Sequence, residues 1–235
     1  MASDRWLTFD CYGTIADWNT SMRRALEPCA GRRAAAMLTA YHQAELMLEA
    51  APWRPYREIL TEGVRGAARR AGVTLDDSGA AAFVRAWPTM TIFDDAGPAL
   101  TALADDGWRL AILTNCDDDL FAATAAKLPV QFDEVVTAEQ VRSYKPDLRH
   151  FTTFSERTGA RAENWIHVAN GWVHDILPAA RLGVRSVWVD RDLTGHPAKV
   201  ADRRITSMRR LADTVADVNA LPAFSLPGGA AGLRD

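Results

Sequence analysis

The chain has 235 residues, of which 48% are hydrophobic, and a formal net charge of −3 at pH 7. This length allows a sizeable buried core, while the near-neutral charge disfavours nucleic acid as a partner, and no apolar run reaches the roughly 18 residues that cross a membrane. Three cysteines without metal-ligand spacing, and the lack of a secretory leader, favour a cytoplasmic protein.

Five short apolar segments with β-branched or aromatic residues predict buried strands, and the segments between them have helical or loop patterns. The five segments are residues 6–9, 109–114, 134–137, 165–169 and 186–189. Short strands that alternate with helices predict an α/β fold with a parallel sheet and right-handed crossovers.

The gap between the first two predicted strands is much longer than a simple crossover needs, which indicates an insertion. Within it, the apolar spacing predicts helices over residues 34–48, 56–71 and 78–87. Helices inserted directly after the first strand would lie over the carboxyl ends of the sheet, where ligands bind in open parallel sheets. The insertion is therefore expected to be a cap over a site.

These patterns divide the chain into a Rossmann-like core and a helical cap. The core would comprise residues 1–16 and 94–222, including a strand or helix pair within 205–218, and the cap would comprise residues 17–93. The last segment, residues 223–235, is rich in Gly and Ala and is expected to be a flexible tail.

Polar residues follow the first predicted strand. Asp10 ends the strand and precedes a turn that contains Gly13 and Thr14. A carboxylate in this place is held rigidly where a substrate can approach it, which suits a nucleophile. Taken alone, Asp10 could equally cap the turn or the next helix.

Three later segments add polar groups at further strand ends. LAILTN ends on Thr114 and Asn115, SYKPD contains Lys145, and IHVANGWVHD contains Asn170 and Asp175. Each residue alone has an ordinary structural explanation, as a cap or a solvated side chain. Together they would bring a hydroxyl, amides, an amine and carboxylates to one edge of a single sheet.

The segments FDCYGT, LTN, YKPD and HVANGWVHD, in this order, resemble the four motifs of the haloacid dehalogenase superfamily. The insertion after the first motif resembles that superfamily's first type of cap. The resemblance extends from about residue 5 to residue 191. Within the superfamily, D-x-Y-G-T is the pattern of the L-2-haloacid dehalogenase branch, whereas phosphatases typically show D-x-D-G-T.

The resemblance implies a role for each matching residue. Asp10 would attack a substrate carbon and form an ester, and Lys145 would lie beside Asp10 and keep it ionised. Asp175 would help to activate the water that hydrolyses the ester. The residues that would orient Asp10 or the substrate are Thr14, Thr114 and Asn115.

Tyr12 stands where phosphatases carry a second aspartate. A phosphate monoester expels an alkoxide, which benefits from a proton delivered by a positioned acid. Tyrosine, with a reference pKa of about 10, replaces that acid poorly. Because a halide leaves without a proton, Tyr12 favours carbon–halogen cleavage, and we expect Tyr12 to contact the substrate.

Asn170 stands where the phosphatase branch normally carries an acid that ligates magnesium. A neutral amide holds a hard cation less well, so we expect no cofactor and expect Asn170 to contact the substrate. In the phosphatase alternative, Mg²⁺ would bind Asp10, the Tyr12 carbonyl and Asp175. The five steps from Asn170 to Asp175 resemble the phosphatase form of this motif, which leaves the role of Asp175 open.

The cap departs from the family pattern at the arginine that receives the substrate carboxylate or the departing halide. The nearest match is His42, which is cationic only part of the time near neutral pH. Arg54 or Arg57 could substitute for it, or could be solvated at a helix start. The aromatic residues expected between cap and core are Trp18, Trp53, Tyr56 and Phe151.

Four further residues lie next to the motifs. His167 is expected to be a core histidine, and His174 is expected to hydrogen-bond to residues of the site. Cys11 and Cys116 are interpreted as small buried side chains, because neither has a base that would make it a nucleophile.

The leading interpretation is a metal-independent hydrolase with Asp10 as covalent nucleophile, acting on the carbon–halogen or a related bond of a small 2-substituted carboxylic acid. The alternatives are a Mg²⁺-dependent small-molecule phosphatase, attack at carbon that opens a strained ring or expels another group, and a binding module without catalysis. The resemblance also implies a homodimer, and no membrane partner is expected.

Overall fold

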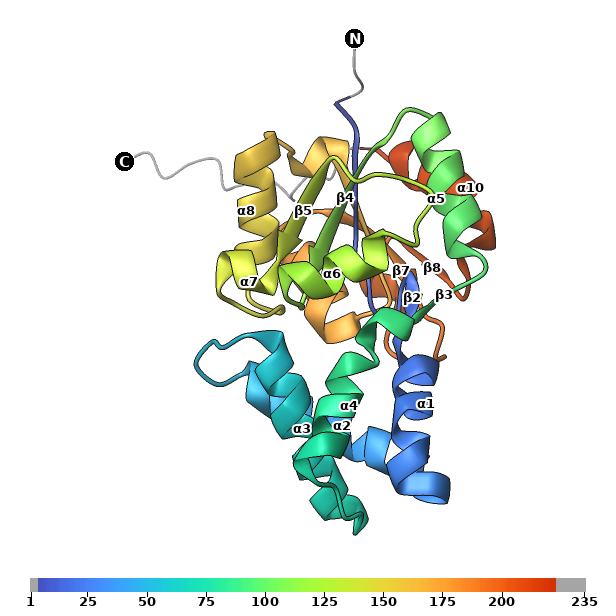
Figure 1. The fold of residues 1–235 in the computed structure, drawn as a ribbon. Helices are drawn as coiled ribbons and strands as arrows, with labels where there is room; N and C mark the ends of the chain where they lie inside the picture. Colours follow the sequence, from blue (N-terminus) through green and yellow to red (C-terminus); the bar gives the residue numbers. More distant parts are fainter. Residues whose placement is uncertain (1–3, 223–235) are drawn as a thin grey trace.

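The computed structural model describes residues 4–222 of the chain. A sheet with helices on both faces forms one part, and a group of helices lies beyond one end of the strands of that sheet (Figure 1). Among the described residues, no helix is long and apolar enough to cross a bilayer. The predicted flexible tail, residues 223–235, lies outside the described residues.

The main sheet is parallel, and its order in the described chain is β5-β4-β1-β6-β7-β8. Its strands are β1 (Trp6–Phe9), β4 (Arg109–Thr114), β5 (Glu134–Thr137), β6 (Trp165–Ala169), β7 (Arg185–Val189) and β8 (Arg203–Ile205). All five predicted strands form, and β7 begins one residue earlier than expected. The segment 205–218 supplies the end of β8 and then a helix.

The strands of the sheet are buried on both faces because helices cover both faces. The helices of this part are α5 (Ala96–Asp105), α6 (Asp118–Ala125), α7 (Ala138–Val141), α8 (Arg149–Thr158), α9 (Leu177–Arg181) and α10 (Leu211–Asn219). Leu7 and Phe9 of β1 pack into one apolar cluster with α5 and α10, and Trp6 packs into a second cluster with α8 and α9. The parallel sheet and its covering helices confirm the predicted α/β fold.

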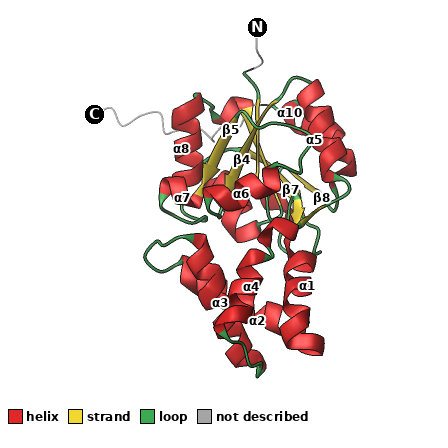
Figure 2. Cartoon of the chain, in the orientation of Figure 1, coloured by secondary structure: helices red, strands yellow, loops and turns green. Residues whose placement is uncertain are grey.

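The helices inserted after β1 form the cap, which lies apart from the strands in Figure 2. They are α1 (Trp18–Ala30), α2 (Ala34–Glu49), α3 (Tyr56–Ala71) and α4 (Asp77–Arg85). The chain enters and leaves the cap through a short antiparallel pair, β2 (Ala16–Asp17) and β3 (Thr91–Ile92). The α4 helix ends at Arg85, earlier than predicted, and a 3₁₀ turn that contains Pro88 follows it.

A buried carboxylate of the core caps a helix of the cap. Pro55, which precedes α3, has no side chain that can accept hydrogen bonds from the first turn. Asp117 accepts these bonds instead, from the backbone N–H of Tyr56 at 2.7 Å and of Arg57 at 3.0 Å. Since unpaired N–H groups at a helix start need an acceptor, Asp117 fixes α3 against the core.

Candidate active site

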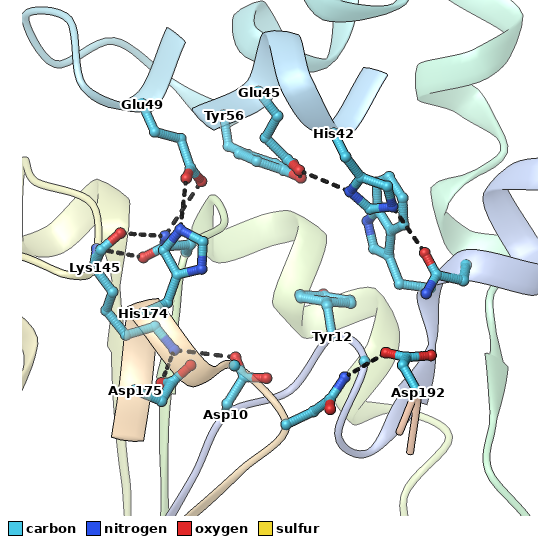
Figure 3. A pocket seen from close by; sticks show the side chains of 16 residues that line it. Asp10, Tyr12, His42, Glu45, Glu49, Tyr56, Lys145, His174, Asp175 and Asp192 are labelled. Carbon is cyan, nitrogen blue, oxygen red and sulfur yellow. Dashed lines mark hydrogen bonds and ion pairs between the residues drawn. The ribbon is translucent and has the colours of Figure 1, made fainter. Parts of the chain in front are cut away.

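The candidate site lies where the carboxyl ends of three neighbouring strands face the cap. Asp10 follows β1, Asn115 follows β4 and Asn170 follows β6. Because β1 lies between β4 and β6, these side chains meet at one edge of the sheet. They line a cavity of about 410 Å³ that α2 closes from the cap side (Figure 3).

Lys145 joins the two carboxylates of the site. Its Nζ donates to Asp10 Oδ1 at 3.0 Å, to Asp175 Oδ1 at 2.6 Å and to the Leu113 carbonyl at 2.8 Å. Only 1% of the Lys145 side chain is exposed. The three hydrogens of the ammonium group therefore all have acceptors, and one cation serves two buried anions.

The ionisation of these three groups follows from burial and pairing. Burial would lower the pKa of Lys145, but the charges of Asp10 and Asp175 outweigh burial and raise it. Burial would raise the pKa of Asp175, but Lys145 and His167 lower it to about 2. Burial raises the pKa of Asp10, and Lys145 and Thr14 oppose part of that rise. Asp175 therefore stays ionised, while Asp10 depends on its neighbours for its charge.

Thr14 and Asn170 hold Asp10 from the side opposite to Lys145. The Thr14 hydroxyl donates to Asp10 Oδ2 at 2.7 Å and accepts a hydrogen bond from the Asn170 backbone N–H at 2.8 Å. Each oxygen of Asp10 thus has one donor, and the carboxylate has a fixed orientation at the floor of the cavity.

A buried chain of hydrogen bonds orients Asp175. The Trp165 indole donates to the Thr8 hydroxyl at 2.6 Å, and the same hydroxyl lies 2.8 Å from His167 Nδ1. His167 Nε2 lies 3.1 Å from Asp175 Oδ1. If Thr8 donates to Nδ1, the proton of His167 is on Nε2 and points at Asp175. His167 is buried in the core as predicted, and it also supports the site.

The wide spacing between Asn170 and Asp175 contains a turn of π-helix, Trp172–Ile176. Such turns place one more residue per turn than an α-helix, and they are frequent at functional sites. The turn brings Asp175 back to Lys145, so the spacing that left the role of Asp175 open still delivers its carboxylate to the site.

Asn115 connects two loops of the core to the cap. Its Oδ1 accepts from the Lys145 backbone N–H at 2.7 Å, and its Nδ2 donates to the Lys145 carbonyl at 3.1 Å and to Glu49 Oε1 at 3.2 Å. Thr114 is fully buried, and its hydroxyl lies 3.5 Å from Cys116 Sγ. Asn115 therefore lines the cavity and fixes the backbone of Lys145, whereas Thr114 lies behind it.

The surface of the cavity opposite Asp10 is here named the roof of the pocket, and it consists of Trp18, His42, Glu45, Glu49 and Tyr56. Both glutamates were missed by the sequence analysis. A signal was present, because residues 42, 45 and 49 are three and four positions apart on α2 and so lie on one helix face.

Glu49 and His174 form an ion pair between cap and core. Their Oε2 and Nε2 atoms are 3.4 Å apart. Burial raises the pKa of Glu49, and its hydrogen bond to His174 opposes that rise. Burial lowers the pKa of His174, but the hydrogen bond and charge of Glu49 outweigh burial and raise it. His174 is thus within ion-pair distance of a residue that lines the cavity, and it lines the cavity itself.

Tyr12 lines the cavity with its ring, but its hydroxyl is engaged elsewhere. The hydroxyl lies 3.0 Å from Thr124 Oγ1, lies 3.3 Å from the Leu120 carbonyl and accepts from the Trp87 indole at 3.1 Å. Burial raises the pKa of this hydroxyl well above its usual value. Tyr12 is therefore unable to act as the acid that a phosphate ester needs.

The substitution Tyr12→Phe tests this separation of ring and hydroxyl. We expect a loss of about 1–2 kcal/mol in the free energy of unfolding, because the buried Trp87 indole and Thr124 lose a partner. We expect a much smaller loss of turnover than from a change at Asp10. Urea unfolding and steady-state kinetics measure the two effects, and a drop in turnover as large as that of an Asp10 variant would contradict the interpretation.

Three residues predicted to bind substrate do not line this cavity, which corrects those predictions. Phe151 is fully buried against Trp165 in the cluster behind the sheet. Trp53 packs beside the guanidinium of Arg142 outside the cavity. Arg54 pairs with Glu62 at 2.6 Å along the cap surface. Phe151 lies on α8, which packs on the sheet, whereas Trp53 and Arg54 lie on the segment that leads into α3.

Arg57, the other candidate for the missing cap arginine, pairs with core residues outside the cavity. Its guanidinium contacts Asp117 at 3.2 Å and Asp119 at 2.5 Å. His42, by contrast, does line the cavity, as do Trp18 and Tyr56. The described part of the chain therefore places no arginine on the cavity wall.

Part of the ligand set considered for a divalent cation, namely Asp10, the Tyr12 carbonyl and Asp175, is engaged by other groups. Asp175 Oδ1 already accepts from Lys145 and from His167. Asn170 donates through Nδ2 to Asp192 at 3.1 Å and contributes no charge. Over residues 4–222, no three acidic, His or Cys side chains are grouped so as to hold a metal ion.

Comparison with known proteins agrees with this geometry. The family model of haloacid dehalogenase-like hydrolases matches residues 5–183. The (S)-2-haloacid dehalogenase 4A of Burkholderia cepacia is 30% identical over 204 residues, covering 82% of this chain and 85% of that protein. An (S)-2-haloacid dehalogenase of Pseudomonas putida is 25% identical over 199 residues, covering 81% and 86%.

A solved structure shows the same fold. The L-2-haloacid dehalogenase from Xanthobacter autotrophicus with chloropropionic acid covalently bound has a TM-score of 0.77 to this chain at 19% identity. The match covers 90% of this chain and 98% of that one. With the family model and the Burkholderia relative, the chain belongs to the haloacid dehalogenase-like hydrolases.

Proposed function

We propose that the chain is a dehalogenase that hydrolyses small 2-halocarboxylic acids through an ester on Asp10. The observation that carries the proposal is the hydrogen bonding of Asp10, whose two oxygens accept from Lys145 and Thr14 at the floor of a cavity. A carboxylate held in this way can attack a carbon atom placed above it. The names of the dehalogenase relatives support the same reaction.

The first step forms a bond between an Asp10 oxygen and C2 of the substrate. The carbon–halogen bond breaks at the same time, and the halide leaves with the electron pair. The halide needs no proton, which agrees with the engagement of the Tyr12 hydroxyl outside the cavity. Lys145 stays protonated and stabilises the attacking carboxylate form of Asp10.

The second step is attack by water on the ester carbonyl of Asp10. It releases a 2-hydroxy acid, restores Asp10 and yields one proton. Asp175 stays ionised at neutral pH because its pKa is lowered to about 2, and we assign it the role of orienting this water together with Lys145.

His174 is proposed to receive the substrate carboxylate. It lines the cavity and lies between Glu49 and Asp10 in the view of Figure 3. The raised pKa of His174 keeps its imidazole cationic over more of the neutral range than an isolated histidine. This assignment gives a cation to a pocket whose cap arginine is missing.

The setting of the enzyme is proposed on sequence grounds. Cys11, Cys29 and Cys116 are unpaired, which suits a cytoplasmic enzyme. The net charge of −3 supports a small-molecule substrate over nucleic acid. A homodimer is proposed from the family resemblance.

Halide release tests the proposed function. With each enantiomer of 2-chloropropionate and EDTA present, we expect chloride and lactate in equal amounts, because neither step uses a metal. Release of phosphate from p-nitrophenyl phosphate, with and without Mg²⁺, is measured in parallel. Magnesium-dependent phosphate release without chloride release from any small haloacid would reject the proposal in favour of a phosphatase.

A further inference from the structure

The pocket has an excess of negative charge. The carboxylates that line it are those of Asp10, Glu45, Glu49, Asp175 and Asp192. The basic side chains that line it are Lys145, His42 and His174. Lys145 is shared by Asp10 and Asp175, and His174 is paired with Glu49. Glu45 is therefore the carboxylate of the roof that faces a ligand bound above Asp10.

Glu45 is held in place by one of its oxygens. Its Oε1 accepts from the Tyr56 hydroxyl at 2.5 Å and from the Tyr41 hydroxyl at 3.3 Å. Its Oε2 lies 3.5 Å from His42 Nδ1, which is longer than a normal hydrogen bond. One oxygen thus orients the carboxylate, and the other retains room for a ligand.

His42 lies beside that oxygen. Its Nε2 lies 2.9 Å from Asn19 Oδ1, and an amide oxygen only accepts, so Nε2 carries the proton. His42 Nδ1 faces Glu45 Oε2 at 3.5 Å. This contact leaves Glu45 Oε2 able to accept from an ammonium group, which has three donors.

Aromatic rings complete this environment. Trp18 and Tyr56 belong to the roof, and the Tyr12 ring lines the wall next to it. Trp18 also packs against His42, with 4.9 Å between ring centroids. A cation is attracted to the faces of such rings, so carboxylate and aromatic groups together recognise an amine more than a second anion.

We propose that the roof of the pocket selects 2-halocarboxylic acids that also carry a protonated amine, which Glu45 Oε2 binds. The inference rests on the proposed function for the reacting carbon, whereas recognition of the amine rests on the roof alone. The amine takes no part in bond breaking. The smallest substrate of this class is 3-amino-2-chloropropionate, which would yield 3-amino-2-hydroxypropionate, chloride and a proton.

Binding of two unreactive ligands tests the inference without turnover. β-Alanine and butyrate differ only in an ammonium group that replaces a methyl group. By isothermal titration calorimetry, we expect β-alanine to bind at least about tenfold more tightly than butyrate, as a charge-assisted hydrogen bond provides. Equal binding, or tighter binding of butyrate, would overturn the inference.

A matched pair of variants locates the effect. Glu45→Gln is expected to lose most of the preference for β-alanine, whereas Glu27→Gln, an exposed change on α1, is expected to keep it. A preference that survives in Glu45→Gln would overturn the assignment to Glu45. If Glu45→Gln does not fold, the two ligands on the unaltered protein still decide whether the amine is recognised.

Turnover separates this inference from the proposed function. The reactive pair is 3-amino-2-chloropropionate and 2-chlorobutyrate, compared by kcat/KM for chloride release. A higher kcat/KM for the amine supports the inference if Glu45→Gln lowers kcat/KM for 3-amino-2-chloropropionate by a larger factor than kcat/KM for 2-chlorobutyrate. Chloride release that favours 2-chlorobutyrate keeps the dehalogenase and rejects the amine site. Tight β-alanine binding without chloride release from either compound keeps the amine site and rejects the dehalogenase.

Discussion

Replacing Asp10 with asparagine is expected to lower chloride release by about a thousandfold or more, because the neutral amide does not form the ester. Thr14 and Lys145 still have a partner of the same shape, so the fold is expected to survive. The measurement is chloride release at saturating substrate, with circular dichroism to compare the folded fraction.

Isotope labelling identifies the nucleophile directly. In a single turnover in H₂¹⁸O, hydrolysis of an ester on Asp10 places ¹⁸O in the Asp10 carboxylate, which mass spectrometry of the peptide detects. Asp106→Asn, at an exposed residue after α5, is the control and is expected to keep full activity. Retention of activity within tenfold in Asp10→Asn, or ¹⁸O found only in the product, would rule out Asp10 as the nucleophile.

Replacing Lys145 with methionine is expected to destabilise the fold by about 3–5 kcal/mol, because it leaves two buried carboxylates without their shared cation. Without the ammonium, the pKa values of Asp10 and Asp175 rise in the folded state. These carboxyl groups then ionise at lower pH in the unfolded chain than in the folded chain. The loss in the free energy of unfolding is therefore small below about pH 4, where the carboxyl groups are protonated in both states, and grows as pH rises. Urea unfolding at several pH values measures this dependence.

The same variant is expected to shift the pH dependence of catalysis. Asp10 must be ionised to attack, and a higher pKa moves the acid side of the kcat/KM profile to higher pH. A second change, Asp175→Asn, removes one uncompensated carboxylate and is expected to restore part of the stability without restoring activity. If Lys145→Met is as stable as the unaltered protein at neutral pH, the shared-cation description of the site is wrong.

Part of the site was predictable because strand ends are a local property of the sequence. Asp10, Asn115 and Asn170 each follow a short apolar run, and parallel strands bring their carboxyl ends to one edge. Motif order added Lys145 and Asp175, which the structure joins through a single ammonium group. Their catalytic roles stay predictions until the variants are measured.

The walls of the cavity were less predictable because they depend on how helices rotate and dock. Phe151 is on a helix that packs on the sheet, and Arg54 is on the segment entering α3, where its side chain pairs with Glu62. Glu45 and Glu49 share a helix face with His42, but only docking of α2 over the sheet turns that face towards Asp10. The proposed limits of core and cap likewise stay predictions.

The sequence by itself determined the α/β sheet, the helical insertion and the strand-end carboxylate, since apolar periodicity is a short-range property and the alternation of strands with helices predicts a parallel sheet. Tertiary structure alone decided where the Tyr12 hydroxyl points and what charge faces Asp10. These features require contacts between residues of the cap and residues of the core, and such contacts form only when the two are packed together.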